Sequence, residues 1–357
     1  MAWFIVFVLI FFAFSFIYLR GENLSYLDTH DYPLPEGEPS DEHHQVVASL
    51  TDMISVIKTG PRRGRLRSLR AYLDGMSDGK VFESRFLPVD TESVKGEWVL
   101  APGASSSRRI LYIHGGAWVA GSPKSHRTVT SRLSRVANAA VFSLNYRLMP
   151  ENRRRDGIDD CRNAYRWILS NGPEGVEDID FVVVAGDSAG GNLALSLIAW
   201  VRDQRLRDPD AALAFSPAVD SAMMSPSLSI NVASDPMLGP QLGFLTRVPK
   251  IVLWWLSWAA SRIRPGDAIV SPLRGDLSGL PPVLIQVSEA EMLFDDTRRY
   301  VAKAQAAGSP VEMQHWPFMV HVWQIFTPEL PEAGAAYDNI TEFLNSVEGN
   351  MEIENVG

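Results

Sequence analysis

The sequence predicts an α/β fold in which a mostly parallel central sheet carries helices on both faces. Four short apolar runs, RILYIH, AAVFSLNY, DFVVVAG and PPVLIQV, lie between residues 109 and 287. Each run is apolar on consecutive residues, as expected for parallel strands that are buried on both faces. Amphipathic helical patterns separate the runs, and this alternation of strand and helix is typical of a doubly wound sheet.

The chain starts with a long apolar segment. Residues 1–19 carry no charge and Arg20 ends the run, which is about the length that a helix needs to cross a hydrocarbon core of about 30 Å. Residues 1–20 are therefore predicted to form a single-pass transmembrane anchor, whose orientation stays open because Arg20 is the only basic residue nearby. The alternative is a cleaved signal that leaves a secreted or periplasmic protein, but no clear basic start or small-residue cleavage site is present.

Residues 21–94 are expected to contain a linker followed by N-terminal cap helices. The linker is rich in Pro, Gly and acids (DYPLPEGEPSDE), and after it Val46, Leu50 and Ile54 recur at helical spacing. Residues 95–357 are expected to form the main domain. Within it, residues 221–265 break the strand–helix alternation and include the run IVLWWLSWAA. This segment is predicted to be a helical cap inserted above the sheet.

Composition excludes several classes of partner and site. The net charge of −9 argues against nucleic acid as a partner, because a phosphate-binding surface needs clustered Lys and Arg. The single cysteine, Cys161, excludes an internal disulfide and a zinc site of the CxxC kind. We expect no metal and no cofactor.

The stretch GDSAG, residues 186–190, matches the G-x-S-x-G pattern of a nucleophile elbow. It follows an apolar strand and begins a helical pattern, which is the context that this turn requires. The turn would hold Ser188 in a strained backbone conformation with its hydroxyl above the sheet. Ser188 is the predicted nucleophile.

A serine nucleophile needs a base, and the base needs an orienting acid. Two histidines follow Ser188. His315 lies in a predicted strand, whereas His321 follows a proline-containing loop, where the base should lie, so His321 is favoured. The acid should follow the strand PPVLIQV, where the candidates are Glu289, Glu291, Asp295 and Asp296. Asp295 and Asp296 directly precede a helix and are expected to cap it, so Glu291 is preferred.

The stretch HGGAW, residues 114–118, lies at the end of the first apolar run. Acyl transfer builds a negatively charged oxygen, which backbone N–H groups stabilise by about 2.7–4 kcal/mol per donor. Glycines let the backbone approach a substrate closely. Gly115 and Gly116, with Ala189 directly after the nucleophile, are therefore the predicted oxyanion hole.

Together these stretches resemble the hormone-sensitive-lipase-like branch of the α/β-hydrolase carboxylesterases, over about residues 95–345. HGGAW corresponds to the family's HGGG, NYRLMPE to its YRLAPE, and GDSAGGNLA to its elbow. The resemblance implies an α/β-hydrolase fold, with the acid at Glu291 and the base at His321. The chain departs from the family in two places: Ala117 replaces the third glycine, and Arg153–Arg155 follow YRLMPE, where we expect a charged surface loop rather than an altered active-site mouth.

The resemblance implies a serine carboxylesterase that hydrolyses small-molecule esters with short to medium acyl chains through an acyl-enzyme. Lactonase, amidase or deacetylase activity on the same residues is the alternative. A non-catalytic ligand receptor of the same fold is a further alternative, but it would be expected to lack a member of the Ser–His–acid set. The sequence leaves open whether the protein forms a homodimer.

Overall fold

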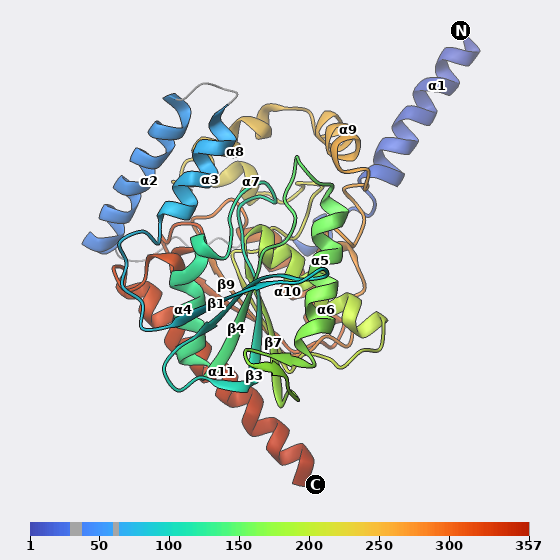
Figure 1. Ribbon diagram of the computed structural model, residues 1–357. Helices are drawn as coiled ribbons and strands as arrows, with labels where there is room; N and C mark the ends of the chain where they lie inside the picture. The colour runs from blue at the N-terminus through green and yellow to red at the C-terminus, as the bar shows by residue number, and fades with distance from the viewer. Residues whose placement is uncertain (29–37, 60–63, 357) are drawn as a thin grey trace.

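The computed structural model describes residues 1–28, 38–59 and 64–356, and its centre is an eight-stranded sheet (Figure 1). The strand order is β1-β2-β4-β3-β7-β8-β9-β10. Strand β2 pairs antiparallel with β1 and β4, and the other pairs are parallel, so the predicted mostly parallel sheet is confirmed. The strands are β1 (Arg85–Asp90), β2 (Lys95–Leu100), β3 (Ser105–Ile113), β4 (Ala139–Leu144), β7 (Phe181–Asp187), β8 (Ala211–Phe215), β9 (Val283–Ser288) and β10 (Val311–Trp316). A separate hairpin pairs β5 (Asn171–Gly172) with β6 (Gly175–Val176).

Helices cover both faces of the sheet and bury two hydrophobic cores. One core packs α5 (Arg154–Ile168), α6 (Ala189–Asp203) and α10 (Phe294–Ala306) against the sheet. The other packs α4 (Arg127–Val136) and α11 (Pro331–Val356) against the opposite face. Every residue of β4, β7, β8 and β9 is buried, which explains their consecutive apolar side chains.

A set of helices lies above the carboxyl ends of the parallel strands (Figure 1). Two come from the N-terminal region, α2 (Asp41–Thr59) and α3 (Arg65–Gly75). The others come from the predicted insertion and are α7 (Ser227–Ile230), α8 (Gly239–Leu242), the 3-10 helix η5 (Gly243–Arg247) and α9 (Lys250–Ser261). Helix α3 is fastened to the body by Arg70, whose guanidinium donates to both carboxylate oxygens of Glu151 at 2.9 and 2.8 Å.

The N-terminal region differs from the predicted membrane-spanning helix. Helix α1 (Ala2–Ala13) is followed by a π-helix, η1 (Phe14–Leu19). None of the helices in the described ranges is both long enough and apolar enough to span a membrane. The physical reason is that the second half of the segment packs on the protein: Ser15 and Leu19 are fully buried, and the indole N–H of Trp255 on α9 donates to Ser15 Oγ at 3.0 Å.

The segment after η1, predicted as part of a linker, packs on the domain. Leu24 is 2% exposed and belongs to the same core as the sheet. Asp28 accepts two hydrogen bonds, at 2.6 and 2.9 Å, from the buried guanidinium of Arg299 on α10. Residues 29–37 of the predicted linker lie outside the described ranges.

Candidate active site

Ser188 lies in the tight turn between β7 and α6. Its backbone has φ 52° and ψ −115°, a strained conformation for a residue with a side chain. The turn is this sharp because glycines flank it: a Cβ on Gly190 would lie 1.9 Å from the Ile113 carbonyl oxygen, and one on Gly186 would lie 2.5 Å from the Gly190 oxygen. The sequence therefore forms a nucleophile elbow here, with Ser188 at the carboxyl end of β7.

Ser188, His321 and Glu291 form one continuous hydrogen-bonded chain. His321 Nε2 lies 2.8 Å from Ser188 Oγ, and His321 Nδ1 lies 2.6 Å from Glu291 Oε2. The three residues come from the loops after β7, β10 and β9. Because parallel strands end at the same edge of a sheet, residues 133 positions apart in sequence meet there.

The protein fixes the carboxylate of Glu291 from both sides. Its Oε1 accepts hydrogen bonds from the Ser216 hydroxyl at 2.6 Å and from the Ser288 N–H at 2.9 Å, while Oε2 faces His321. Burial alone would lower the pKa of His321, but the charge of Glu291 and the hydrogen bond to it raise this pKa above its ordinary value. The imidazole is thus a stronger base than a free histidine.

Asp235, which the sequence analysis did not single out, supports the acid from the cap. Its carboxylate accepts from the N–H groups of Met292, at 2.9 Å, and of Leu238, at 2.7 Å. Burial, together with the nearby Glu291, raises the pKa of Asp235. The residue ties the insertion to the loop that carries Glu291. Asp235 begins the stretch DPML, residues 235–238, but no local pattern there indicates such a contact across the fold.

The other acid and base candidates lie in separate contacts. His315 is on β10, where its Nδ1 pairs with Glu289 Oε1 at 2.6 Å, and its side chain is half exposed. The expectation that Asp295 and Asp296 cap α10 is wrong, because the N-cap residue is Leu293. Their carboxylates instead bind the start of the insertion: Asp295 accepts from the Ser227 N–H at 2.8 Å, and Asp296 accepts from the Ser225 hydroxyl.

The HGGAW loop lies against the elbow, and Asp187 joins the two. Asp187 Oδ1 accepts hydrogen bonds from the Gly115 N–H at 2.9 Å and the Tyr112 hydroxyl at 2.6 Å. The approach is so close that a Cβ on Gly115 would lie 2.1 Å from Asp187 Oδ2. Of the three predicted oxyanion donors, Gly115 therefore has its N–H engaged with Asp187. The N–H groups of Gly116 and Ala189 bond to no acceptor within the described part of the chain.

Two buried histidines surround this junction. His126 Nε2 lies 3.3 Å from Asp187 Oδ2, and although burial would raise the pKa of Asp187, His126 and the Tyr112 hydroxyl bring it below its ordinary value. His114 stacks on Tyr146, and its Nδ1 donates to the Gly115 carbonyl at 2.8 Å. Complete burial lowers the pKa of His114 to about 3, so this ring is neutral at physiological pH. Sequence reasoning missed Asp187 and His126, because their roles depend on contacts between separate strands and helices.

The two departures from the family motif lie in and next to the HGGAW loop, because Ala117 belongs to it and Arg154 contacts its Trp118. Ala117 has φ 54°, the left-handed region that favours glycine. The arginines after YRLMPE were expected to form a charged surface loop, but Arg153 is the N-cap of α5, and Arg154 and Arg155 are its first two residues. Arg153 and Arg155 are exposed as expected, whereas Arg154 is not. Arg154 is buried at the start of α5 with its guanidinium 3.7 Å from the centre of the Trp118 ring, and burial lowers its pKa to about 9.

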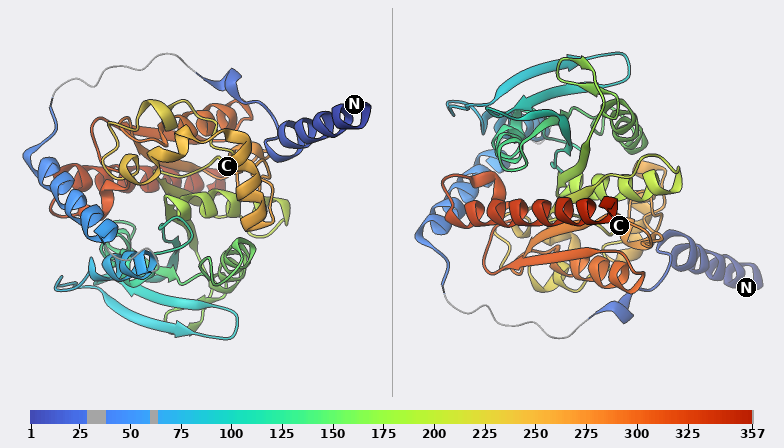
Figure 2. Two further views of the ribbon diagram at one scale, coloured as in Figure 1. Left: turned by 90° about the horizontal axis from the view of Figure 1, so that it is seen from above. Right: turned by 90° about the horizontal axis from the view of Figure 1, so that it is seen from below.

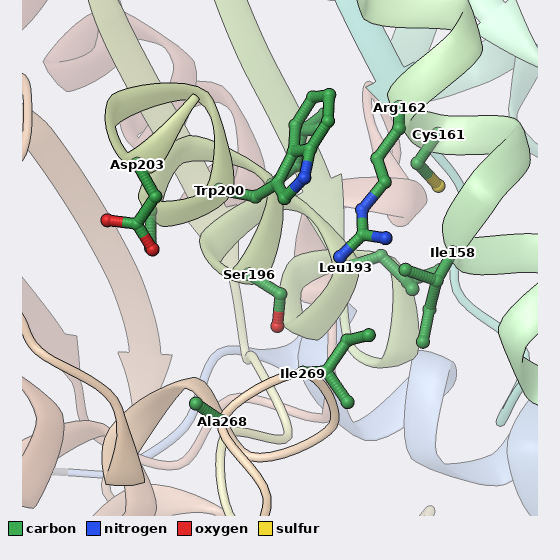
Figure 3. A pocket seen from close by; sticks show the side chains of 11 residues that line it. Ile158, Cys161, Arg162, Leu193, Ser196, Trp200, Asp203, Ala268 and Ile269 are labelled. Carbon is green, nitrogen blue, oxygen red and sulfur yellow. The ribbon is translucent and has the colours of Figure 1, made fainter. Parts of the chain in front are cut away.

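A cavity of about 160 Å³ opens at Ser188 and His321. Its walls are mainly apolar side chains from α2, α3, the insertion and the loop after His321; they include Leu50, Leu69, Tyr72, Leu73, Met76, Met237, Leu238, Val322, Ile325 and Phe326. A second cavity, of about 180 Å³, lies between α5, α6 and residues 268–269 (Figure 3). Cys161 lines this second cavity, and burial raises the pKa of its thiol. None of Ser188, His321 and Glu291 lines the second cavity. Across residues 1–28, 38–59 and 64–356, no cluster of three or more His, Cys, Asp or Glu side chains is arranged to hold a metal ion.

Comparisons with known proteins agree with this architecture. The model of a family described as an alpha/beta hydrolase fold matches residues 110–325. An acetyl-hydrolase of Streptomyces hygroscopicus is 38% identical over 254 residues, which cover 71% of this chain and 80% of the relative. The carboxylesterase/phospholipase LipF of Mycobacterium tuberculosis is 33% identical over 282 residues, 75% of this chain and 71% of the relative. The crystal structure of an esterase from the bacterial hormone-sensitive lipase family superposes with a TM-score of 0.74 at 31% identity, covering 87% of this chain and 99% of that one.

Proposed function

This chain belongs to the α/β-hydrolase fold family and is a carboxylic ester hydrolase, and we propose that it acts through an acyl-enzyme formed on Ser188. The observation that carries the proposal is the chain of hydrogen bonds from Ser188 Oγ through His321 to Glu291, at 2.8 and 2.6 Å. A serine hydroxyl paired with a base, which is in turn oriented by a buried carboxylate, has the geometry of nucleophilic acyl transfer.

In the first half of the reaction, Ser188 Oγ attacks the ester carbonyl while His321 Nε2 accepts the hydroxyl proton. Glu291 holds the ring in position and stabilises the imidazolium that forms. As the tetrahedral intermediate collapses, His321 returns the proton to the leaving alkoxide and the alcohol departs. In the second half, His321 accepts a proton from water, hydroxide attacks the acyl group, and the carboxylic acid leaves as Ser188 recovers its proton.

The oxyanion of both tetrahedral intermediates is assigned to the N–H groups of Gly116 and Ala189. Gly115 belongs to the same loop, but its N–H donates to Asp187 at 2.9 Å, so its proposed role is to hold Gly116 in place. Each oxyanion donor contributes about 2.7–4 kcal/mol of transition-state stabilisation. No cofactor takes part in this scheme.

The cavity at Ser188 favours esters with short to medium acyl chains as substrates, because its walls are mainly apolar and its volume is only about 160 Å³. Hydrolysis of lactones, amides or acetylated metabolites by the same residues is the alternative. One relative is named acetyl-hydrolase, which is consistent with an acetylated substrate. A ligand receptor is the less supported alternative, because a receptor has no need for an activated serine, whereas Ser188, His321 and Glu291 are hydrogen-bonded to one another.

Activity profiling tests this proposal. The purified protein should hydrolyse a series of p-nitrophenyl esters with a maximum at short to medium acyl length, and lactones and anilides in the same assay separate the alternatives. Ser188→Ala and His321→Ala should each lower kcat by about 10⁴-fold or more, without adding to each other in the double variant.

A fluorophosphonate probe should label Ser188 in the wild type but not in His321→Ala. The matched control is His315→Ala, because His315 also pairs with a glutamate but belongs to a separate contact. The control should keep both turnover and labelling. If Ser188→Ala hydrolyses these esters at the wild-type rate, the proposed mechanism is wrong.

A further inference from the structure

Helix α1 exposes apolar side chains on all its sides. In all three views it projects away from the rest of the molecule (Figures 1 and 2). Five consecutive residues, Trp3 to Phe7, are exposed, from 87% for Trp3 to 44% for Val6. Successive residues of an α-helix are about 100° apart, so these five side chains point in every direction around the axis. A helix that is apolar all round belongs inside a protein or a lipid phase.

The base of this helix is fixed to the cap. Trp255 of α9 stacks on Phe11, with ring centres 5.5 Å apart, and packs at a tilt against Phe14, with ring centres 5.2 Å apart. Its indole N–H donates to Ser15 Oγ at 3.0 Å. Leu19 is fully buried, and its carbonyl accepts from the Gly266 N–H at 2.8 Å. Helix α1 is therefore positioned by the folded domain.

Helix α9 continues the apolar surface. Val252 and Leu256 are four residues apart, so they share one face, and both are exposed at 44% and 60%. The opposite face carries Trp254, which is buried. Because α9 contacts the base of α1 through Trp255, its exposed apolar face belongs to the same region of the molecule as α1.

Cationic and amphipathic side chains gather at the junction between α1 and the body. Arg20 lies 5.3 Å from the ring centre of Phe16, and Arg264 lies 5.5 Å from that of the exposed Tyr18. Arg264 also pairs with Asp267 at 3.5 Å, and the neighbouring Arg262 is exposed. Tyrosine, tryptophan and arginine favour the boundary between lipid headgroups and acyl chains, and arginine also pairs with lipid phosphates.

We propose that α1 and the exposed face of α9 form a membrane-binding surface that inserts into one leaflet of a bilayer. The 12 residues of α1 extend about 18 Å, which is slightly more than half of a hydrocarbon core of about 30 Å. In the inserted state, Phe7 and its neighbours lie among the acyl chains, and Tyr18, Arg20 and Arg264 lie at the headgroups. A second copy of the chain would cover one side of α1, whereas lipid covers all sides and meets the arginines with phosphates.

Site-specific fluorescence on the full chain tests this placement. The one cysteine, Cys161, is 1% exposed, so a cysteine introduced by Phe7→Cys takes an environment-sensitive dye selectively. Mixed with phosphatidylcholine/phosphatidylglycerol vesicles, this label should shift to the blue and be quenched by brominated acyl chains, but not by a quencher trapped inside the vesicles. The same dye on Val176→Cys, an 89% exposed apolar site on β6, should not respond.

Flotation with the same vesicles gives the second measurement. Replacing Phe7 and Ile10 together by Asp should lower the vesicle-bound fraction by about tenfold or more, while the matched Val176→Asp leaves it unchanged. All variants should hydrolyse a water-soluble ester at the wild-type rate, so this test is independent of the proposed reaction.

Several results would overturn the proposal. One is flotation that survives both Asp substitutions, and another is a Phe7 label that does not respond to vesicles. Quenching from inside the vesicles would show a helix that spans the bilayer. A shift of the Phe7 label that depends on protein concentration without vesicles, together with a dimer in sedimentation, would identify a second copy of the chain as the occupant.

Discussion

The pKa of His321 should be visible in the pH dependence of activity. The negative charge of Glu291, 2.6 Å from Nδ1, raises the pKa of His321 above its ordinary value despite burial. In the proposed mechanism, His321 must be neutral to accept the Ser188 proton, so kcat/KM should fall as the pH drops through this raised pKa.

Glu291→Gln should move that acid limb to lower pH. A glutamine keeps the size of the side chain but removes the charge that favours the imidazolium, so the pKa of His321 falls. Maximal kcat should fall as well, because the imidazolium formed during attack loses its counter-charge. Profiles of kcat/KM between about pH 4 and 9 measure the shift, and Glu289→Gln, the partner of His315, is the control. An acid limb that stays in place in Glu291→Gln would contradict the assignment.

Asp187 is expected to position the oxyanion loop, since it accepts the Gly115 N–H at 2.9 Å from directly beside the nucleophile. Asp187→Ala should lower kcat by about one to two orders of magnitude with little change in KM, less than the about 10²–10³ lost with an oxyanion donor. Asp187→Asn retains an acceptor for Gly115 and should recover part of kcat. Steady-state kinetics of both variants test this, and equal kcat values for the Asn and Ala variants would argue against a positioning role.

At the scale of helices and strands, sequence reasoning succeeded where the local pattern matches the final environment. The apolar runs that form β4, β7 and β9 were predicted to be buried strands, and every residue of these strands is buried. Strand β8 was missed because AALAF is short and mostly alanine, a weak strand former. Strand β1 was missed because none of its six residues is buried, so it is not an apolar run.

The same reasoning failed where a distant partner decides the environment. Arg154 is one of three consecutive arginines, yet it is buried. Its guanidinium lies over the Trp118 ring and donates a hydrogen bond to the Asn192 side-chain oxygen, and both partners come from other elements. The apolar run at the N-terminus has the composition of a spanning helix, but its second half is held against α9 by contacts such as that of Ser15 with Trp255. Such contacts cannot be read from spacing along the chain.

The first turn of α10 carries a buried carboxyl group that should make stability depend on pH. Burial and the neighbouring Asp220 raise the pKa of Asp296 to about 7. The folded protein thus holds this proton more tightly than the unfolded chain does. The free energy of unfolding should therefore fall as the pH rises from about 4, the ordinary carboxyl value, to about 7, and then level off.

Asp296→Asn should remove this loss, because an amide stays neutral across the range. Urea unfolding at pH 5 and pH 8 should give a smaller stability difference for the variant than for the wild type. Asp203→Asn, at the exposed end of α6, is the control and should retain the wild-type difference. If Asp296→Asn loses as much stability between the two pH values as the wild type, Asp296 does not titrate in this window.

On the scale of the whole molecule, the N-terminal segment has two parts with different roles. Residues 2–13 form α1, whose large apolar side chains are mostly exposed. Residues 19–28 cross the surface of the catalytic domain and bury Leu19 and Leu24. Asp28 also neutralises Arg299, whose side chain is 3% exposed.

Two truncations should therefore behave differently. A chain lacking residues 1–13 keeps Leu19, Leu24 and the Asp28–Arg299 pair, so its melting temperature and its kcat on a soluble ester should stay close to those of the full chain. A chain lacking residues 1–28 exposes the sites of both leucines and leaves Arg299 buried without its carboxylate. Buried leucine side chains contribute about 2–5 kcal/mol each, and an unpaired buried charge costs about 3–5 kcal/mol. This shorter chain should melt at a much lower temperature or fail to fold, whereas equal melting temperatures for the two truncations would show that residues 14–28 do not stabilise the domain. Leu24→Ala in the full chain gives the matched point test, with a loss of about 2–5 kcal/mol expected in urea unfolding.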